Sequence, residues 1–368
     1  MASFAVEVHK VKIEPHNGAD ALELAVIGSY KSVVKKDQFK DGDLVAYIPE
    51  ASIVPNEILK EMGLDGRLHG PNKNRVKAIK LRGVVSQGLI YPAKPEWTEG
   101  QDVTESMNIV KYEPPIPVQF AGEIGSSDVN LQYDIENFKK YPDALINGEE
   151  VVMTEKIHGT FFCIGLSSDI EPENKDLLHG HFIVSSKGLI KKGIFLKDNE
   201  RNANNTYIRT AKKFDLGNKL LDILFRLTDA GQIQGDLKGT IWLMGEVYGR
   251  SVQKNSGIEG YDIPEGELAF RAFDIKLGDK YLDYDLFKAM CNTVELETVP
   301  LIYRGEFSRE KLLELTKGTE TVSGKSLHIR EGVVVKPVVE REDGKVGRLI
   351  LKSVSDDYLM KTNGEEIS

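Results

Sequence analysis

The sequence predicts an α+β fold in two parts, a small antiparallel barrel followed by a larger domain of antiparallel sheets with helices. Short alternating strands and turns fill the first part, and from Glu150 onward longer β-runs mix with helical patterns. Between them lies Pro114-Pro115-Ile116-Pro117. Proline cannot continue a strand ladder, so this segment marks a boundary. We therefore expect one domain over 1–112, a linker over 113–149 and a second domain over 150–368.

The N-terminal domain carries alternating hydrophobic patterns separated by turn residues. The expected strands are 4–8, 22–27, 44–48, 76–81 and 87–91. Asn17-Gly18 and Asp41-Gly42-Asp43 are turn signals that bound two of them. About five short strands in about a hundred residues are typical of a small antiparallel barrel, such as an OB-fold.

The second domain is expected to combine strands with a few helices. The strands are 150–155, 160–166, 181–186, 240–247, 268–275, 332–338 and 346–352. The helices are a short one near 136–140 in the linker, then 206–228, 283–292 and 308–317. Ser308 is a suitable N-cap for the last helix, and Gly318 a suitable stop.

Composition restricts the classes of protein. The chain has 368 residues, of which 40% are hydrophobic, and its net charge is −9. It has no apolar run long enough to span a membrane, and its N-terminus lacks the pattern of a secretory signal. Two cysteines in a chain this long indicate a reducing compartment, so we expect a cytoplasmic protein. The charge argues against indiscriminate coating of nucleic acid.

A local basic surface is still compatible with the overall charge. Residues 60–82 contain seven basic and two acidic residues. The candidate nucleic-acid contacts in this stretch are Arg67, Lys73, Arg75, Lys77, Lys80 and Arg82. A solvated face is the simpler explanation for any one such cluster.

The segment Lys156-Ile157-His158-Gly159-Thr160 follows an apolar strand and can present a nucleophilic lysine. An ordinary lysine has a pKa near ~10.4 and is a poor nucleophile at neutral pH. Neighbouring cations and a metal would lower that pKa. Lys336 and Lys352, each in a later strand, could do this if they converge on Lys156.

Further polar residues interrupt the apolar strands in a fixed order. They are Lys187 in Ser-Lys-Gly, Glu246 in Gly-Glu-Val-Tyr-Gly, Phe273-Asp274, Glu331 with Lys336 in Glu-Gly-Val-Val-Val-Lys, and Lys352. A nucleoside triphosphate needs such a set, because an aromatic ring stacks on a base, carboxylates bind ribose or metal, and lysines neutralise phosphates. A polar residue at a strand end that faces water is a sufficient explanation for any one of these positions. It does not explain why they occur together in this order.

This series resembles the six collinear motifs of the covalent nucleotidyltransferases, and the Lys-x-His-Gly form is similar to the RNA ligase 2 branch. Residues 13–24 and 81–89 resemble the OB module of the RNA ligase 5 group, the Deinococcus RNA ligase type, and residues 299–305 also look like this group. The resemblance implies an OB-like barrel followed by a nucleotidyltransferase domain with ATP-grasp-like antiparallel sheets. Three positions differ from the usual pattern, namely Lys187, Ile350 and Phe161.

The resemblance also implies the chemistry. Lys156 would accept AMP from ATP and pass it to an RNA 5′-phosphate, and a 3′-hydroxyl would then displace it. The implied nucleotide contacts are Glu155, Ile157, His158, Gly159, Lys187, Glu246, Phe273 and Asp274. Lys336 and Lys352 would contact the α-phosphate. Glu331, alone or together with Glu246, would hold Mg²⁺ or Mn²⁺.

The expected partner is RNA or an RNA-containing duplex, with sealing of nicks that carry RNA on the 3′-hydroxyl side, and we expect a monomer with no membrane contact. Two alternatives stay open. A capping-type guanylyltransferase of the same superfamily would form lysyl-GMP, and a nucleic-acid-binding protein could carry an inactive transferase domain.

Overall fold

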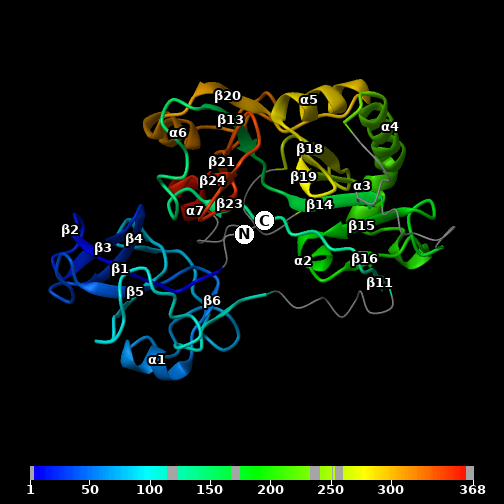
Figure 1. The fold of residues 1–368 in the computed structure, drawn as a ribbon. Coiled ribbons are helices and arrows are strands. Elements are labelled where there is room, and N and C mark those ends of the chain that lie inside the picture. Colours follow the sequence, from blue (N-terminus) through cyan, green and yellow to red (C-terminus); the bar gives the residue numbers. More distant parts are fainter. Residues whose placement is uncertain are drawn as a thin grey trace.

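The computed structural model describes residues 4–113, 123–166, 175–232, 241–250, 252 and 260–361 (Figure 1). The proline segment at 114–117 lies outside these residues. The two expected parts are visible as a small β domain at the N-terminus and a larger α+β body (Figure 1). No helix among the described residues has the length and apolar character needed to cross a membrane.

The N-terminal domain is built mainly from two antiparallel sheets. One has the order β1 (Glu7–Lys10), β5 (Leu44–Ile48), β9 (Leu89–Pro92). The other has the order β2 (Lys12–Pro15), β3 (Leu22–Ile27), β4 (Tyr30–Lys35). A short pair, β6 (Ser52–Ile53) with β10 (Val110–Lys111), and helix α1 (Asn56–Glu61) complete one end.

A hairpin of β7 (Ile79–Leu81) and β8 (Val84–Ser86) belongs to the same domain. Its two turn residues, Arg82 and Gly83, both have positive φ, at 48° and 91°. Two-residue hairpin turns adopt this conformation because its twist matches that of the strands. Each of the five expected strands overlaps an observed one, while α1 and the strands β2, β4, β6, β8 and β10 were not predicted.

The larger body contains two five-stranded sheets. The first has the order β12 (Glu136–Asn137), β24 (Leu351–Val354), β21 (Gly332–Pro337), β13 (Glu150–Lys156), β20 (Leu301–Glu306). The second has the order β15 (Phe182–Ser186), β14 (Thr160–Leu166), β17 (Ile241–Tyr248), β18 (Ala269–Leu277), β19 (Lys280–Tyr281). Their pairings are antiparallel, apart from the parallel pair β12–β24.

Helices pack against these sheets. α3 (Thr206–Lys213), α4 (Leu216–Asp229) and α5 (Tyr284–Thr293) share the main core with the second sheet. α6 (Arg309–Thr316) packs on the first sheet, and Ser308 caps it as predicted, since its hydroxyl accepts from the Lys311 N–H. α2 (Lys187–Ile190) and β16 (Ile194–Leu196) follow β15, and β16 pairs with β11 (Ile124–Ser126).

Three sequence predictions in this body are wrong in detail. Residues 136–140 form β12 and a turn rather than a helix, because Glu136 and Asn137 pair with β24. The helix expected over 206–228 is broken at Asp215, whose φ is 52°. The strand expected over 346–352 is two strands, β23 (Gly347–Arg348), which pairs with β22 (Glu342–Asp343), and β24.

The N-terminal domain contacts the larger body near the C-terminal helix α7 (Asp356–Lys361), which faces that domain (Figure 1). Val85 of the β7–β8 hairpin packs against Val354, Tyr358 and Leu359. Lys139 Nζ donates to Gln87 Oε1 at 2.7 Å and to Asp356 Oδ1 at 2.9 Å. The two parts are therefore joined by an apolar contact and a polar bridge.

Candidate active site

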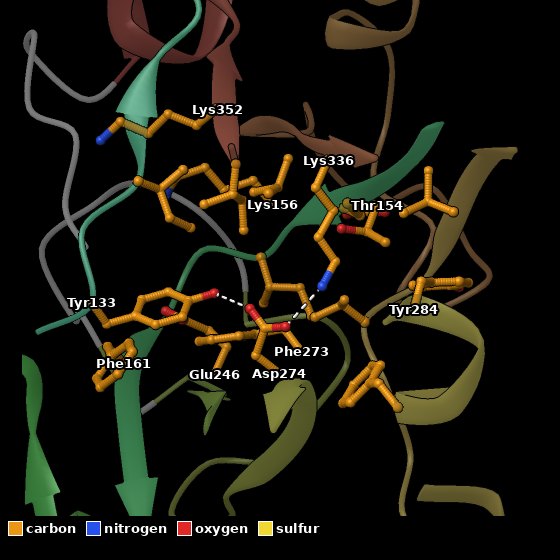
Figure 2. A pocket seen from close by; sticks show the side chains of 18 of the residues that line it. Tyr133, Thr154, Lys156, Phe161, Glu246, Phe273, Asp274, Tyr284, Lys336 and Lys352 are labelled. Atoms are coloured by element: carbon orange, nitrogen blue, oxygen red, sulfur yellow. Dashed lines mark hydrogen bonds and ion pairs between the residues drawn. The ribbon is translucent and has the colours of Figure 1, made fainter. Parts of the chain in front are cut away.

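A pocket opens between the two five-stranded sheets, and charged side chains from both enter it (Figure 2). Its walls surround about 900 Å³ of space, part of which is open solvent. Lys156, Lys336 and Lys352 come from the first sheet. Glu246 and Phe273 come from the second.

Lys156 lies at the end of β13, and its Nζ is 2.5 Å from Glu331 Oε1. Both side chains are buried, with 10% of the lysine side chain and none of the glutamate exposed. The register explains the contact, because Lys156 pairs with Gly332, the residue after Glu331. A buried ammonium needs such a partner, since desolvation of an isolated charge is costly.

Glu246 is the second buried carboxylate of this region. Burial raises its pKa to about 8; the nearby Lys156 opposes this shift and Glu331 adds to it. Its Oε1 is buried and accepts no hydrogen bond from any described residue. A cation would satisfy that oxygen and relieve the repulsion between Glu246 and Glu331.

The two glutamates therefore suit a divalent metal. Mg²⁺ is commonly held by one or two carboxylates and keeps several waters. No group of three or more metal-ligating side chains occurs within the part of the chain that the structure describes.

An aromatic cluster lines another part of the pocket. The Tyr133 ring centroid lies 5.4 Å from those of Phe161 and Phe273, which are 5.8 Å from each other. All three rings border the pocket (Figure 2). A planar base could stack against this wall. Phe161, one of the residues that depart from the usual pattern, thus extends the aromatic surface of Phe273.

Asp274 anchors a network of charges on the same side. Its oxygens meet the Tyr133 hydroxyl at 2.5 Å, Lys336 Nζ at 2.8 Å and Arg348 Nη1 at 2.9 Å. Lys336 and Arg348 also both contact Glu340 Oε1, at 2.8 and 2.6 Å. Burial alone would raise the pKa of Asp274, but Arg348 and Lys336 outweigh burial and hold it at about 2.

Most of the predicted site residues do border the pocket. They are Glu155, Lys156, Ile157, Lys187, Glu246, Phe273, Asp274, Lys336 and Lys352. Lys187 also faces Asp134, 3.6 Å from its Nζ. Lys336 points toward Asp274 (Figure 2), so in this state its charge is balanced by Asp274 and Glu340. Glu331 is linked to the pocket through its contact with Lys156.

His158 and Gly159 are not among the residues that line this pocket, and their nucleotide contacts stay predictions. The Gly159 Cα faces the neighbouring strand, where an added Cβ would be 2.3 Å from the Val247 carbonyl oxygen. The glycine thus permits a close approach of strands. The His158 Nδ1 lies 2.7 Å from the Tyr358 hydroxyl, and its backbone N–H donates to the Tyr261 hydroxyl at 2.6 Å.

Glu155 has a structural contact besides its place at the pocket. Its Oε2 accepts from the Thr321 N–H at 2.8 Å and the Thr321 hydroxyl at 2.5 Å. Because strand neighbours alternate sides, Glu155 and Lys156 direct their side chains apart. The carboxylate therefore fixes the segment around Thr321.

Sequence reasoning missed Tyr133, Glu340 and Tyr358, and misplaced Arg348. The strand expected over 346–352 would place Arg348 on the same face as Lys352, but the chain turns between them, and the Ile350 N–H donates to the Arg348 carbonyl oxygen. Tyr133 lies in a segment without periodicity, and no pattern singles it out. The sequence contains one signal for Glu340. It lies four residues after Lys336 and carries the opposite charge.

The six basic residues of the N-terminal domain fall on two separate features. Lys73, Arg75 and Lys77 surround His69, whose pKa is lowered by burial and by these three cations. The Arg75 guanidinium also lies 4.4 Å from the Tyr112 ring centroid. Arg67 lies in the exposed turn before His69. Lys80 and Arg82 belong to the β7–β8 hairpin.

Replacement of Asp274 by asparagine should leave Lys336 and Arg348 buried beside a neutral amide. We expect a loss of about 3–5 kcal/mol in unfolding free energy at neutral pH. The folded pKa of Asp274 is below its ordinary 3.8, so its contribution is complete above that pH and is lost as pH falls through about 2. The deficit of Asp274→Asn should therefore shrink by about 1 kcal/mol between pH 6 and pH 3.

Urea unfolding at several pH values measures this deficit. Asp285→Asn is the matched control, because Asp285 is exposed and pairs with Arg304 at the surface. A deficit for Asp274→Asn as small as that of the control would contradict the role assigned to the network.

Comparisons with known proteins agree with this geometry. A family model described as RNA ligase matches residues 149–354, and one described as an OB-fold domain matches residues 5–93. None of the curated proteins compared with the chain matches it.

Among solved structures, variants of Naegleria gruberi RNA ligase resemble the whole chain. One with AMP and Mn has a TM-score of 0.74 at 21% identity, and one with ATP and Mn has 0.73 at 22%. The N. gruberi enzyme with PPi has 0.73 at 23%. Each match covers 99% of this chain and 100% of the other. These likenesses confirm the predicted α+β fold with its OB module, and because the RNA ligase model spans more than half of the sequence, the chain belongs to the RNA ligase family.

Proposed function

We propose that this chain is an ATP-dependent RNA ligase that seals a 3′-hydroxyl to a 5′-phosphate through a lysyl-AMP on Lys156. The observation that carries the proposal is the buried contact between Lys156 and Glu331 beside a pocket with cationic and aromatic walls. The N. gruberi ligase structures with ATP, AMP and Mn support the choice of nucleotide and metal.

In the first step, the Lys156 Nζ lone pair forms a bond to the α-phosphorus of ATP while the bond to pyrophosphate breaks. The ammonium must first lose a proton, and Glu331 Oε1, at 2.5 Å, is placed to receive it. Lys187 and Lys352 border the same pocket and would offset charge on the phosphates. Adenine would stack against the wall of Phe273 and Phe161.

In the later steps, a 5′-phosphate oxygen of RNA takes the AMP from Lys156, and the 3′-hydroxyl oxygen then attacks that phosphate and releases AMP. Mg²⁺ or Mn²⁺ bound near Glu331 and Glu246 would supply charge neutralisation. Asp274 pairs with Lys336 and Arg348, so the charges on this side of the pocket are already balanced. These residues therefore serve chiefly to shape the pocket.

RNA recognition falls to the N-terminal domain in this proposal. Lys73, Arg75 and Lys77 form a local positive surface, and contacts to phosphates need no base sequence. A nick in a duplex with RNA on the 3′-hydroxyl side offers continuous backbone to such a surface. We therefore propose nicked duplexes as substrates.

Incubation with radiolabelled nucleotide and Mn²⁺ tests the first step. The wild type should retain label from [α-³²P]ATP and not from [α-³²P]GTP, and Lys156→Ala should retain neither. Lys317→Ala, at an exposed position after α6, is the control and should label like the wild type. An adduct from GTP alone would instead identify a capping-type enzyme, and no adduct in the wild type would indicate an inactive domain.

A double change of Lys73 and Lys77 to alanine tests the RNA surface. Without these cations, binding to a nicked duplex should weaken at every sequence, and the salt slope should fall by about 1 for each phosphate that is no longer neutralised. The charge-matched control is Lys317→Ala with Arg226→Ala, two exposed cations of the larger body. Nick affinity equal to that of the control, or much faster sealing of single-stranded ends than of nicks, would contradict this part of the proposal.

A further inference from the structure

His158 lies two residues after the nucleophile, yet it does not border the pocket. Its side chain is 5% exposed, and Nδ1 lies 2.7 Å from the Tyr358 hydroxyl. Its Nε2 is buried and has no hydrogen-bond partner among the described residues. The same Nδ1 lies 4.0 Å from Glu331 Oε2.

Tyr358 is fully buried and belongs to helix α7, 200 residues from His158 along the chain. The start of this helix is tied to the first sheet beside the site, because the Ser355 N–H donates to the Glu331 carbonyl oxygen at 2.8 Å. Helix α7 thus contacts His158 through the Tyr358 side chain. Ser355, just before the helix, contacts Glu331 through the backbone.

The same helix carries the contact with the N-terminal domain. Val85 of the β7–β8 hairpin packs against the apolar cluster of Val354, Tyr358 and Leu359. Lys139 bridges Gln87 of that domain and Asp356 of the helix. A shift of the hairpin would therefore move the residues that hold His158.

The tautomer of His158 decides which of the two groups donates in this hydrogen bond. A phenol is a stronger donor than a neutral imidazole N–H, and the unprotonated imidazole nitrogen is the stronger acceptor. Tyr358 would then donate to Nδ1, and the proton of the ring would lie on Nε2. Tyr261 fixes the backbone of the same residue by accepting from its N–H.

We propose that Tyr358 is a positioning residue that fixes the orientation and the Nε2–H tautomer of His158, and that α7 thereby links docking of the N-terminal domain to the placement of Lys156. This inference rests on the proposed function, in that Lys156 is the AMP acceptor. Partners that orient metal-ligating histidines typically affect activity by about 10- to 100-fold, and we expect an effect of this order for Tyr358.

The test compares Tyr358→Phe with Tyr303→Phe in the full chain. Phenylalanine keeps the packing and removes the hydroxyl, and the Tyr303 hydroxyl donates to a nearby surface carbonyl, that of Glu306. With ¹⁵N-labelled histidine, assigned by a His158→Gln variant, the wild type should show His158 protonated on Nε2. Tyr358→Phe should lose that pattern and slow single-turnover adenylylation by about tenfold or more, while Tyr303→Phe should change neither.

A second variant, Val85→Ser, tests the link from a distance, since Val85 belongs to the N-terminal domain. It should also slow adenylylation, with the tautomer of His158 less uniform. A wild type in which His158 is protonated on Nδ1 would overturn the proposal even if Tyr358→Phe failed to fold. So would a folded Tyr358→Phe with the adenylylation rate of the wild type. Absence of any lysyl-AMP in the wild type would instead overturn the proposed function, while the tautomer would still be measurable.

Discussion

The buried pair of Lys156 and Glu331 is the interaction on which the rest of the site depends. Two charges removed from water are stable together because each satisfies the other, and loss of one partner typically costs about 3–5 kcal/mol. The surrounding structure holds both ends. Gly159 admits the neighbouring strand, β13 pairs with β21 in the register that brings Lys156 beside Glu331, and Ser355 holds the Glu331 backbone.

The two sides of the pocket differ in how their charges are balanced. Around Asp274, two acids and two bases pair closely with one another, and Tyr133 adds a further hydrogen bond. That side can stay fixed while a ligand enters. On the Lys156 side, Glu246 keeps a buried oxygen without a hydrogen bond from any described residue and a pKa of about 8. A bound cation could pair with the carboxylates there, and a bound phosphate with Lys156, so that no charge would be left unpaired.

Sequence alone predicted the strands that carry Lys156, Glu246 and Phe273, because each lies in an apolar run of strand length. It also predicted both parts of the fold. It could not predict which residues that are far apart in the sequence contact one another. Tyr133 and Tyr358 are aromatic residues in segments without a distinctive pattern, and only folding places them on Asp274 and His158.

Local irregularities account for the other differences. A turn at Leu349 and Ile350 separates Arg348 from Lys352, and so directs Arg348 to Asp274. Asp215 breaks the long helix, and the sequence did not predict this break because the position holds neither glycine nor proline. Gly159 admits the neighbouring strand, because an added Cβ would lie 2.3 Å from the Val247 carbonyl oxygen.

The most direct measurement is a mass spectrum of the wild-type protein after incubation with ATP and Mn²⁺, followed by peptide mapping of the modified residue. We predict a mass increase of one AMP, located on Lys156. An adduct on a different residue, such as Lys187 or Lys352, would contradict the role given to the Lys156–Glu331 pair, and so would the absence of any adduct.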